Sequence, residues 1–158
     1  MVIDSSAVLA ILQDEPERHT FNEAIAAASQ RLLSAASLVE LSIVIGARYG
    51  SDGQADLDCF LNTADIQIVS LDRGQAELAR SAFAQFGKGR HRAALNFGDC
   101  FSYALAKWFS QPLLFKGDDF CHTDLVAVAA SSTGPSSVLW PFELLGREPQ
   151  ISRQSQRC

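Results

Sequence analysis

The chain has 158 residues, of which 47% are hydrophobic and 20% charged, and this suits one compact domain with a single core. Its net charge of -5 argues against a protein that wraps nucleic acid through bulk electrostatics, so any nucleic-acid contact must be local. The four scattered cysteines form no C-x-x-C pair, which argues against disulfides or zinc and favours a reducing cytoplasm. No secretory leader and no apolar run of membrane-spanning length is recognised, so we expect neither secretion nor a membrane anchor.

The first half of the chain alternates short apolar runs with segments of helical composition. A Ser cap begins the first helix, Pro16 stands near the start of the second, and Gly50 follows the third. The third helix is apolar nearly all round, which predicts burial, and Glu40 is the one charge inside its apolar face. In chain order we expect a strand at 1–4, helices at 5–12 and 14–29, a strand at 31–34, and helices at 37–49 and 54–64.

The second half continues the same alternation. An Ala-rich helix ends at a basic loop, Asn96 is positioned to cap the next helix, and an acidic turn follows the buried strand after that helix. In chain order we expect a strand at 66–69, a helix at 72–86, the basic loop at 87–92, a helix from 96 to about 109, a strand at 112–115, the acidic turn at 117–120 and a last strand at 126–129.

The alternation of strands and helices predicts an α/β fold, an α/β/α sandwich with a mostly parallel central sheet flanked by helices. Residues 131–137 have the composition of a linker, and residues 138–158 show no periodicity that predicts an element. We therefore expect one domain over residues 1–130 and, over residues 131–158, a C-terminal extension of unknown role and flexible character.

Acidic residues follow several predicted strands, at the sheet edge where α/β proteins build their sites. Asp4 ends the first strand, and Asp119 lies in the turn after the strand at 112–115. Asp99 lies in the first turn of a helix. Glu40 is costly to bury unless a cation or hydrogen-bond donors accompany it.

Each of these acids also has a purely structural interpretation. Asp4 could serve only as a helix cap, and Asp99 could serve only as a charge that the helix dipole favours. Glu40 could form a buried ion pair with Arg31 or Arg48. The remaining candidates could be no more than polar turn residues, namely Asp118, Asp119 and Asp124.

Together the acids indicate more than any one of them does. Carboxylates gathered at one edge repel each other, and a divalent cation would neutralise them. Oxygen-only ligands select a hard ion, Mg²⁺ or Mn²⁺, which can activate a water for attack on phosphorus. If one pocket holds the four strongest candidates, it carries much of the acidity of the chain: Asp4, Glu40, Asp99 and Asp119.

Four segments carry a family pattern in a fixed order over about residues 1–130. The first is Met1-Val2-Ile3-Asp4-Ser5-Ser6-Ala7 and the second is Ala35-Ala36-Ser37-Leu38-Val39-Glu40. The third joins Gly87-Lys88-Gly89-Arg90-His91-Arg92 with Leu95-Asn96-Phe97-Gly98-Asp99-Cys100-Phe101-Ser102-Tyr103, and the fourth joins Leu113-Leu114-Phe115-Lys116-Gly117-Asp118-Asp119-Phe120 with Thr123-Asp124. This pattern resembles the PIN-domain family of nucleases, and specifically the VapC toxins of type II toxin–antitoxin systems.

The resemblance implies a metal-dependent endoribonuclease that uses Mg²⁺ or Mn²⁺, cleaves RNA, arrests growth and is held inactive by a VapB-like antitoxin. It also implies a homodimer. Asp4, Glu40 and Asp99 match the first three acids of the family, and Asp119 matches the fourth better than Asp118 does. Ser6 matches the small hydroxyl residue that positions the first acid, and Asp124 is a further supporting candidate.

Two surface features extend these expectations. Lys88, Arg90 and Arg92 lie close before Asp99 in the sequence and are expected to hold RNA phosphates, although such a charge cluster can also be a solvated turn. The antitoxin is expected in an apolar groove near the site, formed by residues that could equally belong to the core: Leu9, Leu12, Ile43 and Ile45.

Rival functions are disfavoured by the same residues. A metal-dependent phosphatase usually needs a second Asp two residues after the first, where this chain has Ser6, and a phosphoacceptor domain needs an acidic pair after its first strand. An inert PIN fold that only binds a partner is the remaining alternative, and it predicts losses among the site acids that this sequence does not show.

Overall fold

The computed structural model describes residues 1–128, and the strands in this range form one parallel sheet. In space the strand order is β3-β2-β1-β4. Parallel strands need crossover connections, which the helices supply, and their carboxyl ends therefore meet at one edge of the sheet. The four are β1 (Val2–Ile3), β2 (Leu32–Ser34), β3 (Gln67–Val69) and β4 (Leu113–Leu114).

Successive strand residues point to opposite faces of the sheet, which divides the interior into two cores. Ile3, Leu33 and Leu114 belong to one core, while their neighbours Val2, Leu32 and Leu113 belong to the other. The first core is covered by α1 (Ser5–Leu12), α2 (Arg18–Ala27) and α3 (Ala35–Thr63), and the second by α4 (Arg73–Phe86) and α5 (Phe97–Phe109).

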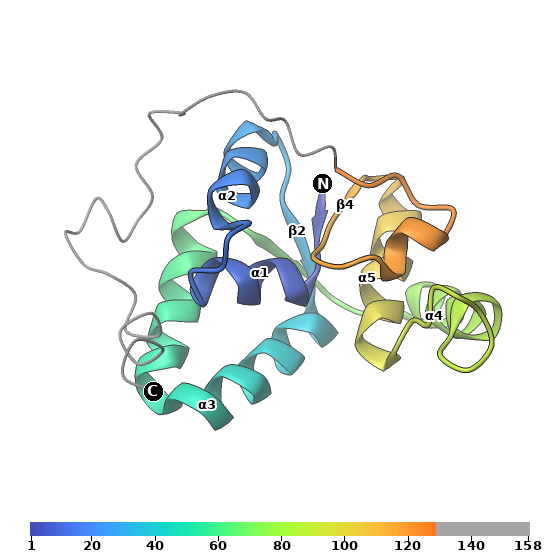
Figure 1. Cartoon of the computed structure of the whole chain (residues 1–158), viewed down its shortest axis with the longest axis horizontal. Helices are drawn as coiled ribbons and strands as arrows, with labels where there is room; N and C mark the ends of the chain where they lie inside the picture. The colour runs from blue at the N-terminus through green and yellow to red at the C-terminus, as the bar shows by residue number, and fades with distance from the viewer. Residues whose placement is uncertain (129–158) are drawn as a thin grey trace.

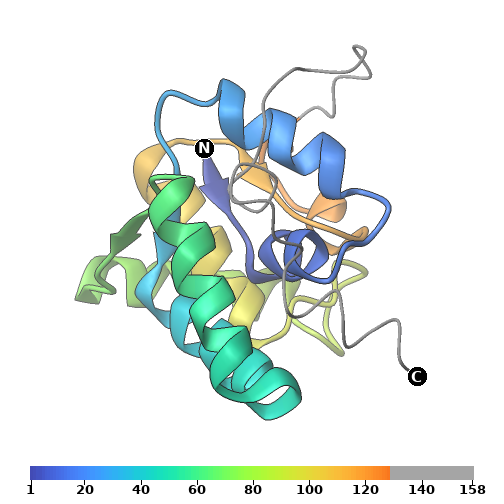
Figure 2. The ribbon, with the colours of Figure 1, turned by 90° about the vertical axis from the view of Figure 1, so that its left-hand side faces the viewer.

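Figure 1 shows these two helical layers on opposite sides of the strands, and Figure 2 looks onto the layer that contains α3. This arrangement is the α/β/α sandwich that the sequence predicts, and the fold-class prediction is confirmed. β1 lies between β2 and β4, so the order of the chain through the sheet reverses beside β1. Sites in α/β folds form at such a reversal, outside the carboxyl ends of the strands.

Helix α3 differs from its prediction in two respects. It continues from Ala35 to Thr63, with a break at Gly50, whose φ of 60° and ψ of -146° are not helical, where the sequence analysis expected two separate helices. The prediction of burial all round was also wrong. The face of Leu41 and Ile45 is buried, but Val39 is 59% exposed and Ile43 is 66% exposed. Apolar composition alone does not reveal which face of a helix the rest of the chain covers.

The chain ends differ from expectation only in detail. Asp4, rather than a serine, is the N-cap of α1. The strand expected at 126–129 is reduced, among the described residues, to a single parallel bridge between Ala127 and Leu113. The linker and extension predicted at 131–158 lie outside the described residues. Among residues 1–128, none of the helices combines the length and the apolar character needed to cross a membrane.

Candidate active site

Asp4 stands at the carboxyl end of the central strand β1 and is only 2% exposed. Its Oδ2 accepts hydrogen bonds from the Ser6 backbone N–H at 2.9 Å and from the Ser6 hydroxyl at 2.6 Å, so it caps α1. The Ser6 Oγ in turn accepts the N–H of Lys116, beyond β4, at 3.0 Å. The expected structural role of Asp4 is therefore present, and Ser6 fixes its carboxylate as the sequence analysis anticipated.

The second oxygen of the Asp4 carboxylate has a different environment. Oδ1 is buried and accepts no hydrogen bond from any described residue. A buried acceptor without a partner is unfavourable, and a native structure usually explains it by a ligand, an ion or a water. Oδ2 of Asp4 therefore caps α1, whereas Oδ1 can still accept a ligand.

Glu40 is half-buried on the first turns of α3. Its Oε2 accepts a hydrogen bond from the Ser5 hydroxyl at 2.9 Å, whereas Arg31, one of its expected ion-pair partners, lies 3.5 Å from Asp65 instead. The carboxylate lies directly over Gly98, where a Cβ would stand 2.5 Å from Oε1. The absence of a side chain at Gly98 therefore lets Glu40 reach the first turn of α5.

Asp99 lies in that first turn of α5 and forms a reciprocal capping box with Asn96. Its Oδ2 accepts the Asn96 N–H at 2.7 Å, and its own N–H donates to Asn96 Oδ1 at 3.0 Å. The structural interpretation of Asp99 is thus correct as far as it goes. The residue is only 9% exposed, so the carboxylate is held away from bulk water.

The pKa of Asp99 depends on the charges of the other three expected acids. Burial and, to a smaller extent, the negative charges of Asp4, Asp119 and Glu40 together raise the pKa of Asp99 to about 6, against the opposing effect of the hydrogen bond from the Asn96 N–H. These three residues are the ones that the sequence analysis grouped with Asp99. Asp119 begins the short 3-10 helix η1 (Asp119–His122), and of the two acids after β4 it is the one whose charge acts on Asp99.

Four carboxylates form an oxygen-only donor set that fits Mg²⁺ or Mn²⁺. The buried, unpartnered Oδ1 of Asp4 and the raised pKa of Asp99 fit a site at which a cation would offset negative charge. As the side chains stand, no three acidic, Cys or His groups in residues 1–128 are close enough to hold one ion. To hold such an ion, the carboxylate groups would have to move closer together, and the charge of the ion would offset their mutual repulsion.

Two other candidates lie outside this group. Asp124 accepts a hydrogen bond from the Tyr103 hydroxyl at 2.6 Å and pairs with the Lys107 Nζ at 2.9 Å, further along α5. These contacts lower the pKa of Asp124. Asp118 is exposed and precedes η1 without capping it by its side chain. Asp124, by contrast, links the segment after η1 to α5 through Tyr103 and Lys107, which is a structural role.

The basic loop is anchored by buried residues and exposes its charges. Ala93 and Leu95 are fully buried, and the N–H of Lys88 donates to the Leu95 carbonyl at 2.9 Å. The side chains of Lys88, Arg90 and Arg92 are exposed. Arg92 contacts the ring of His122 in η1 at 2.5 Å, which places one cation of the loop against the turn that begins with Asp119.

Sequence reasoning missed two residues of the site. Ser5 binds Glu40, and Gly98 makes room for it, although neither had been assigned a role. Both contacts join residues that are distant in the sequence, so periodicity gave no signal for them. The one available indication is local: Gly98 occupies a first helical turn, where glycine is unfavourable and needs a reason.

The comparisons with known proteins agree with this architecture. The PIN domain family model matches residues 1–126. Ribonuclease VapC30 of Mycobacterium tuberculosis (strain ATCC 25618 / H37Rv) is 53% identical over 129 residues, covering 82% of this chain and 98% of that protein. Ribonuclease VapC of Mycolicibacterium smegmatis is 52% identical over 128 residues, covering 81% of this chain and 99% of that protein. The chain therefore belongs to the PIN-domain family and groups with its VapC ribonucleases.

Solved structures show the same fold at low sequence identity. The crystal structure of M. tuberculosis VapC20, a Sarcin-Ricin loop cleaving toxin, aligns with a TM-score of 0.66 at 15% identity, covering 80% of this chain and 97% of the other. A toxin–antitoxin complex from Klebsiella pneumoniae aligns with a TM-score of 0.59 at 14% identity, covering 80% of this chain and 95% of the other. These two likenesses concern the fold alone.

Proposed function

We propose that this protein is a toxin that cleaves RNA by hydrolysis of a phosphodiester bond. The observation that carries the proposal is the burial of Asp99 within range of the negative charges of Asp4, Glu40 and Asp119, which together raise its pKa to about 6. Relatives more than 50% identical over four-fifths of the chain carry the name ribonuclease, which supports the same reaction.

We propose Mg²⁺ or Mn²⁺ as the cofactor and Asp4, Glu40, Asp99 and Asp119 as the residues that would hold it. When bound, such an ion supplies a water activated for attack on phosphorus and stabilises the leaving oxygen. The chain itself positions the acids. Ser6 orients Asp4, Ser5 orients Glu40, and the capping box with Asn96 orients Asp99. The burial of Asp4 and Asp99 limits the access of bulk water to the site.

Substrate binding is assigned to the basic loop. Lys88, Arg90 and Arg92 are exposed beside a strongly acidic site, and an anionic strand needs local cations to approach such a site. Because the chain as a whole carries a charge of -5, the loop supplies attraction that the rest of the surface does not. We expect substitution of all three by alanine to weaken RNA binding and to flatten its dependence on salt concentration.

We also propose a small VapB-like antitoxin as partner, action as a homodimer, and a cytoplasmic location, where RNA is available. The structural neighbour from Klebsiella pneumoniae is a toxin–antitoxin complex, which supports the first of these. Of the four apolar residues expected to form the groove, Leu12 and Ile45 are core residues and Leu9 is half-buried. Ile43 remains, and with Val39 it leaves an exposed apolar face on α3 for a partner.

Incubation of the protein with labelled RNA in Mg²⁺, in Mn²⁺ and in EDTA tests the reaction. We expect cleavage with either ion and none in EDTA, and sequencing of the cut ends then identifies the target. Co-expression with a cognate VapB-like antitoxin should yield a stable complex and restore growth. A protein that binds an antitoxin but leaves RNA intact with both ions would favour the inert interaction module instead.

A further inference from the structure

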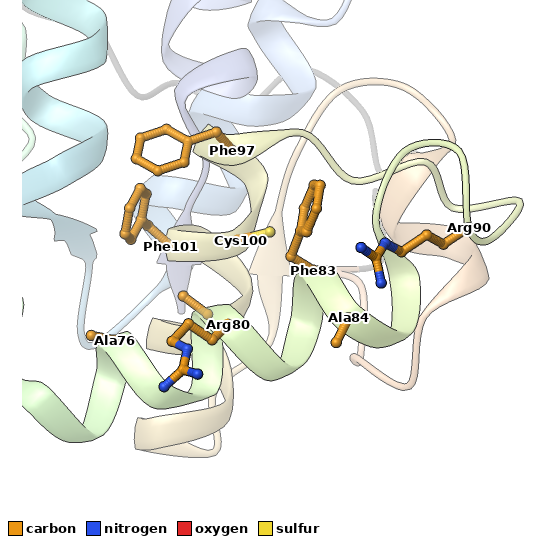
Figure 3. Close-up of a pocket in the computed structure, with 9 residues that line it drawn as sticks. Ala76, Arg80, Phe83, Ala84, Arg90, Phe97, Cys100 and Phe101 are labelled. Atoms are coloured by element: carbon orange, nitrogen blue, oxygen red, sulfur yellow. The ribbon is translucent and has the colours of Figure 1, made fainter.

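An apolar groove of about 560 Å³ lies between α4 and α5, close to the N-terminal end of α5 where Asp99 stands. Three phenylalanines shape it. Figure 3 shows Phe97 and Phe101 extending from α5 on one side and Phe83 rising from α4 on the other, with the small side chain of Cys100 between them. The small residues on α4, among them Ala76 and Ala79, leave the space between the rings open.

Phe97 is the most exposed of the large apolar side chains in residues 1–128, at 79%. Its ring packs edge-to-face on Phe101, with centroids 4.8 Å apart, so a neighbouring ring sets its orientation. An aromatic ring that is both oriented and open to solvent presents a flat π surface for stacking. Phe97 and Asp99 both lie in the first turn of α5, on different faces of the helix, so this surface stands at the same end of α5 as Asp99.

Two arginines give the groove a positive rim. The Arg90 guanidinium lies 5.6 Å from the centroid of the Phe83 ring, a cation–π contact that directs it along the groove. Arg80 lines the groove from α4 and pairs with Glu77 at 2.7 Å. Because that pair is exposed, it is weak and Arg80 can exchange its partner for another anion.

The combination of rings and guanidinium groups decides the kind of ligand. An apolar peptide would fill the interior but would leave both arginines unused. A nucleotide of single-stranded RNA uses both features, because its base stacks on aromatic rings while its phosphate pairs with arginine. A base inside a duplex is stacked on its neighbours and has no free face to offer.

We propose that the α4–α5 groove is a subsite for an unpaired nucleobase of the RNA substrate, at the same end of α5 as the acids that cleave it. This inference rests on the proposed ribonuclease function. Phe97 and Phe101 stack the base, and Arg90 binds an adjacent phosphate, which gives the basic loop a second task besides general attraction. The subsite selects single-stranded over duplex RNA and tolerates different bases, since each base has a π face.

The test compares Phe97→Ala with the wild type on a short, fluorescein-labelled pool of single-stranded RNA of random sequence, in Mn²⁺. We expect KM to rise about 5- to 150-fold, since one stacked base contributes about 1–3 kcal/mol, while kcat changes little. Phe97→Tyr keeps the ring and should restore KM. Phe109→Ala is the matched control, because Phe109 is an exposed phenylalanine at the opposite end of α5, and its KM should equal that of the wild type.

A second measurement detects stacking directly. An RNA that carries 2-aminopurine should lose fluorescence when it binds the wild type in EDTA, and it should lose much less with Phe97→Ala. A KM and a 2-aminopurine signal that Phe97→Ala leaves at wild-type values overturn the subsite.

The same variant also separates the other occupants of the groove. If Phe97→Ala leaves KM unchanged but converts a dimer to a monomer in light scattering, the groove is an interface between two copies of this chain. If it leaves KM unchanged but abolishes antitoxin binding, the groove holds the antitoxin. Either result overturns the proposal. A wild-type protein that cleaves no RNA with either ion would refute the ribonuclease function and the subsite together, so the two failures are distinguishable.

Discussion

Two aspartates near opposite ends of α5 have pKa values shifted in opposite directions. At the N-terminal end, Asp99 is buried among other acids and its pKa rises to about 6. Towards the other end, Asp124 meets the Tyr103 hydroxyl and the Lys107 ammonium, and its pKa falls. The surroundings of Asp124 favour its charge and stabilise the fold, whereas those of Asp99 oppose its charge. An acid kept where ionisation is unfavourable points to a function served by a ligand, and the contrast separates a site residue from a structural one.

The strongest test of this contrast is Asp99→Asn. Asparagine retains an oxygen for the Asn96 N–H but removes the negative charge, so we expect RNA cleavage and Mn²⁺ binding to be lost, with a fall in rate of about 1,000-fold or more. Cleavage rates and calorimetric titration with Mn²⁺ measure the two effects. A variant that cuts RNA at the wild-type rate would reduce Asp99 to a helix cap.

The stability of the same variant should depend on pH in a defined direction. In EDTA the native pKa of Asp99, about 6, lies above the ordinary value of 3.8, so ionisation of Asp99 destabilises the folded state. This destabilisation is absent below about pH 4, grows between about pH 4 and pH 6, and is complete above about pH 6. Asp99→Asn should therefore melt a few degrees higher than the wild type at pH 7.5 and at nearly the same temperature at pH 4. Thermal melts at both pH values measure this difference.

Gly98→Ala tests the position of the Glu40 carboxylate without adding or removing a charge. The new Cβ would stand 2.5 Å from Glu40 Oε1, so the flexible carboxylate must move away from the first turn of α5. We expect cleavage to fall about 100-fold, because displacements of this kind disrupt catalytic geometry, while the melting temperature holds or rises, since alanine favours the helix. Melting and cleavage assays on one preparation separate the two effects. A loss of fold together with activity would show that Gly98 acts through packing alone.

Ser5→Ala tests the other support of Glu40. Removal of the hydroxyl that donates to Oε2 should lower the cleavage rate by about 10-fold and weaken Mn²⁺ binding, the usual result when a ligand loses its supporting hydrogen bond. Ser5→Thr retains a hydroxyl and serves as the matched control, with a rate near that of the wild type. Equal rates for Ser5→Ala and Ser5→Thr would remove Ser5 from the site.

The smallest effect on activity is expected at the other aspartate. Asp124→Asn should leave cleavage unchanged but lower the melting temperature by a few degrees at pH 7, because the hydrogen bond with Tyr103 and the pair with Lys107 both weaken. The pKa of Asp124 is lowered in the native state, so its contribution is present above about pH 3.8 and is lost as the pH falls through the lowered value. Asp118→Asn, at an exposed acid, is the control, and a cleavage defect in Asp124→Asn alone would move Asp124 into the site.

Much of the architecture could be predicted because it is encoded locally. The two strand faces follow from adjacent apolar residues such as Val2 and Ile3, and helix boundaries follow from caps such as Asn96. The placement rule for parallel sheets and the resemblance to the PIN-domain family both pointed to Asp4, Glu40 and Asp119, whose charges act on Asp99. Their roles as metal ligands stay predictions.

Other features could not be predicted because tertiary contacts decide them. Ser5 is 35 residues from Glu40, and no local pattern announces their hydrogen bond. The exposure of Val39 and Ile43 depends on what covers α3, which apolar composition does not reveal. Asp118 and Asp119 are neighbours in the sequence and both are exposed, yet only the charge of Asp119, the first residue of η1, acts on Asp99.

The position of β1 has a consequence for the synthesis of this protein. β1 begins at the second residue of the chain, yet it pairs with β4: Val2 lies opposite Leu113, and the Asp4 N–H donates to the Leu114 carbonyl. Such distant pairings form late, because the intervening chain must be ordered first. A ribosome that has released only the first hundred residues therefore holds a chain whose acids are still scattered. Most of the domain must therefore emerge from the ribosome before β1 can pair with β4.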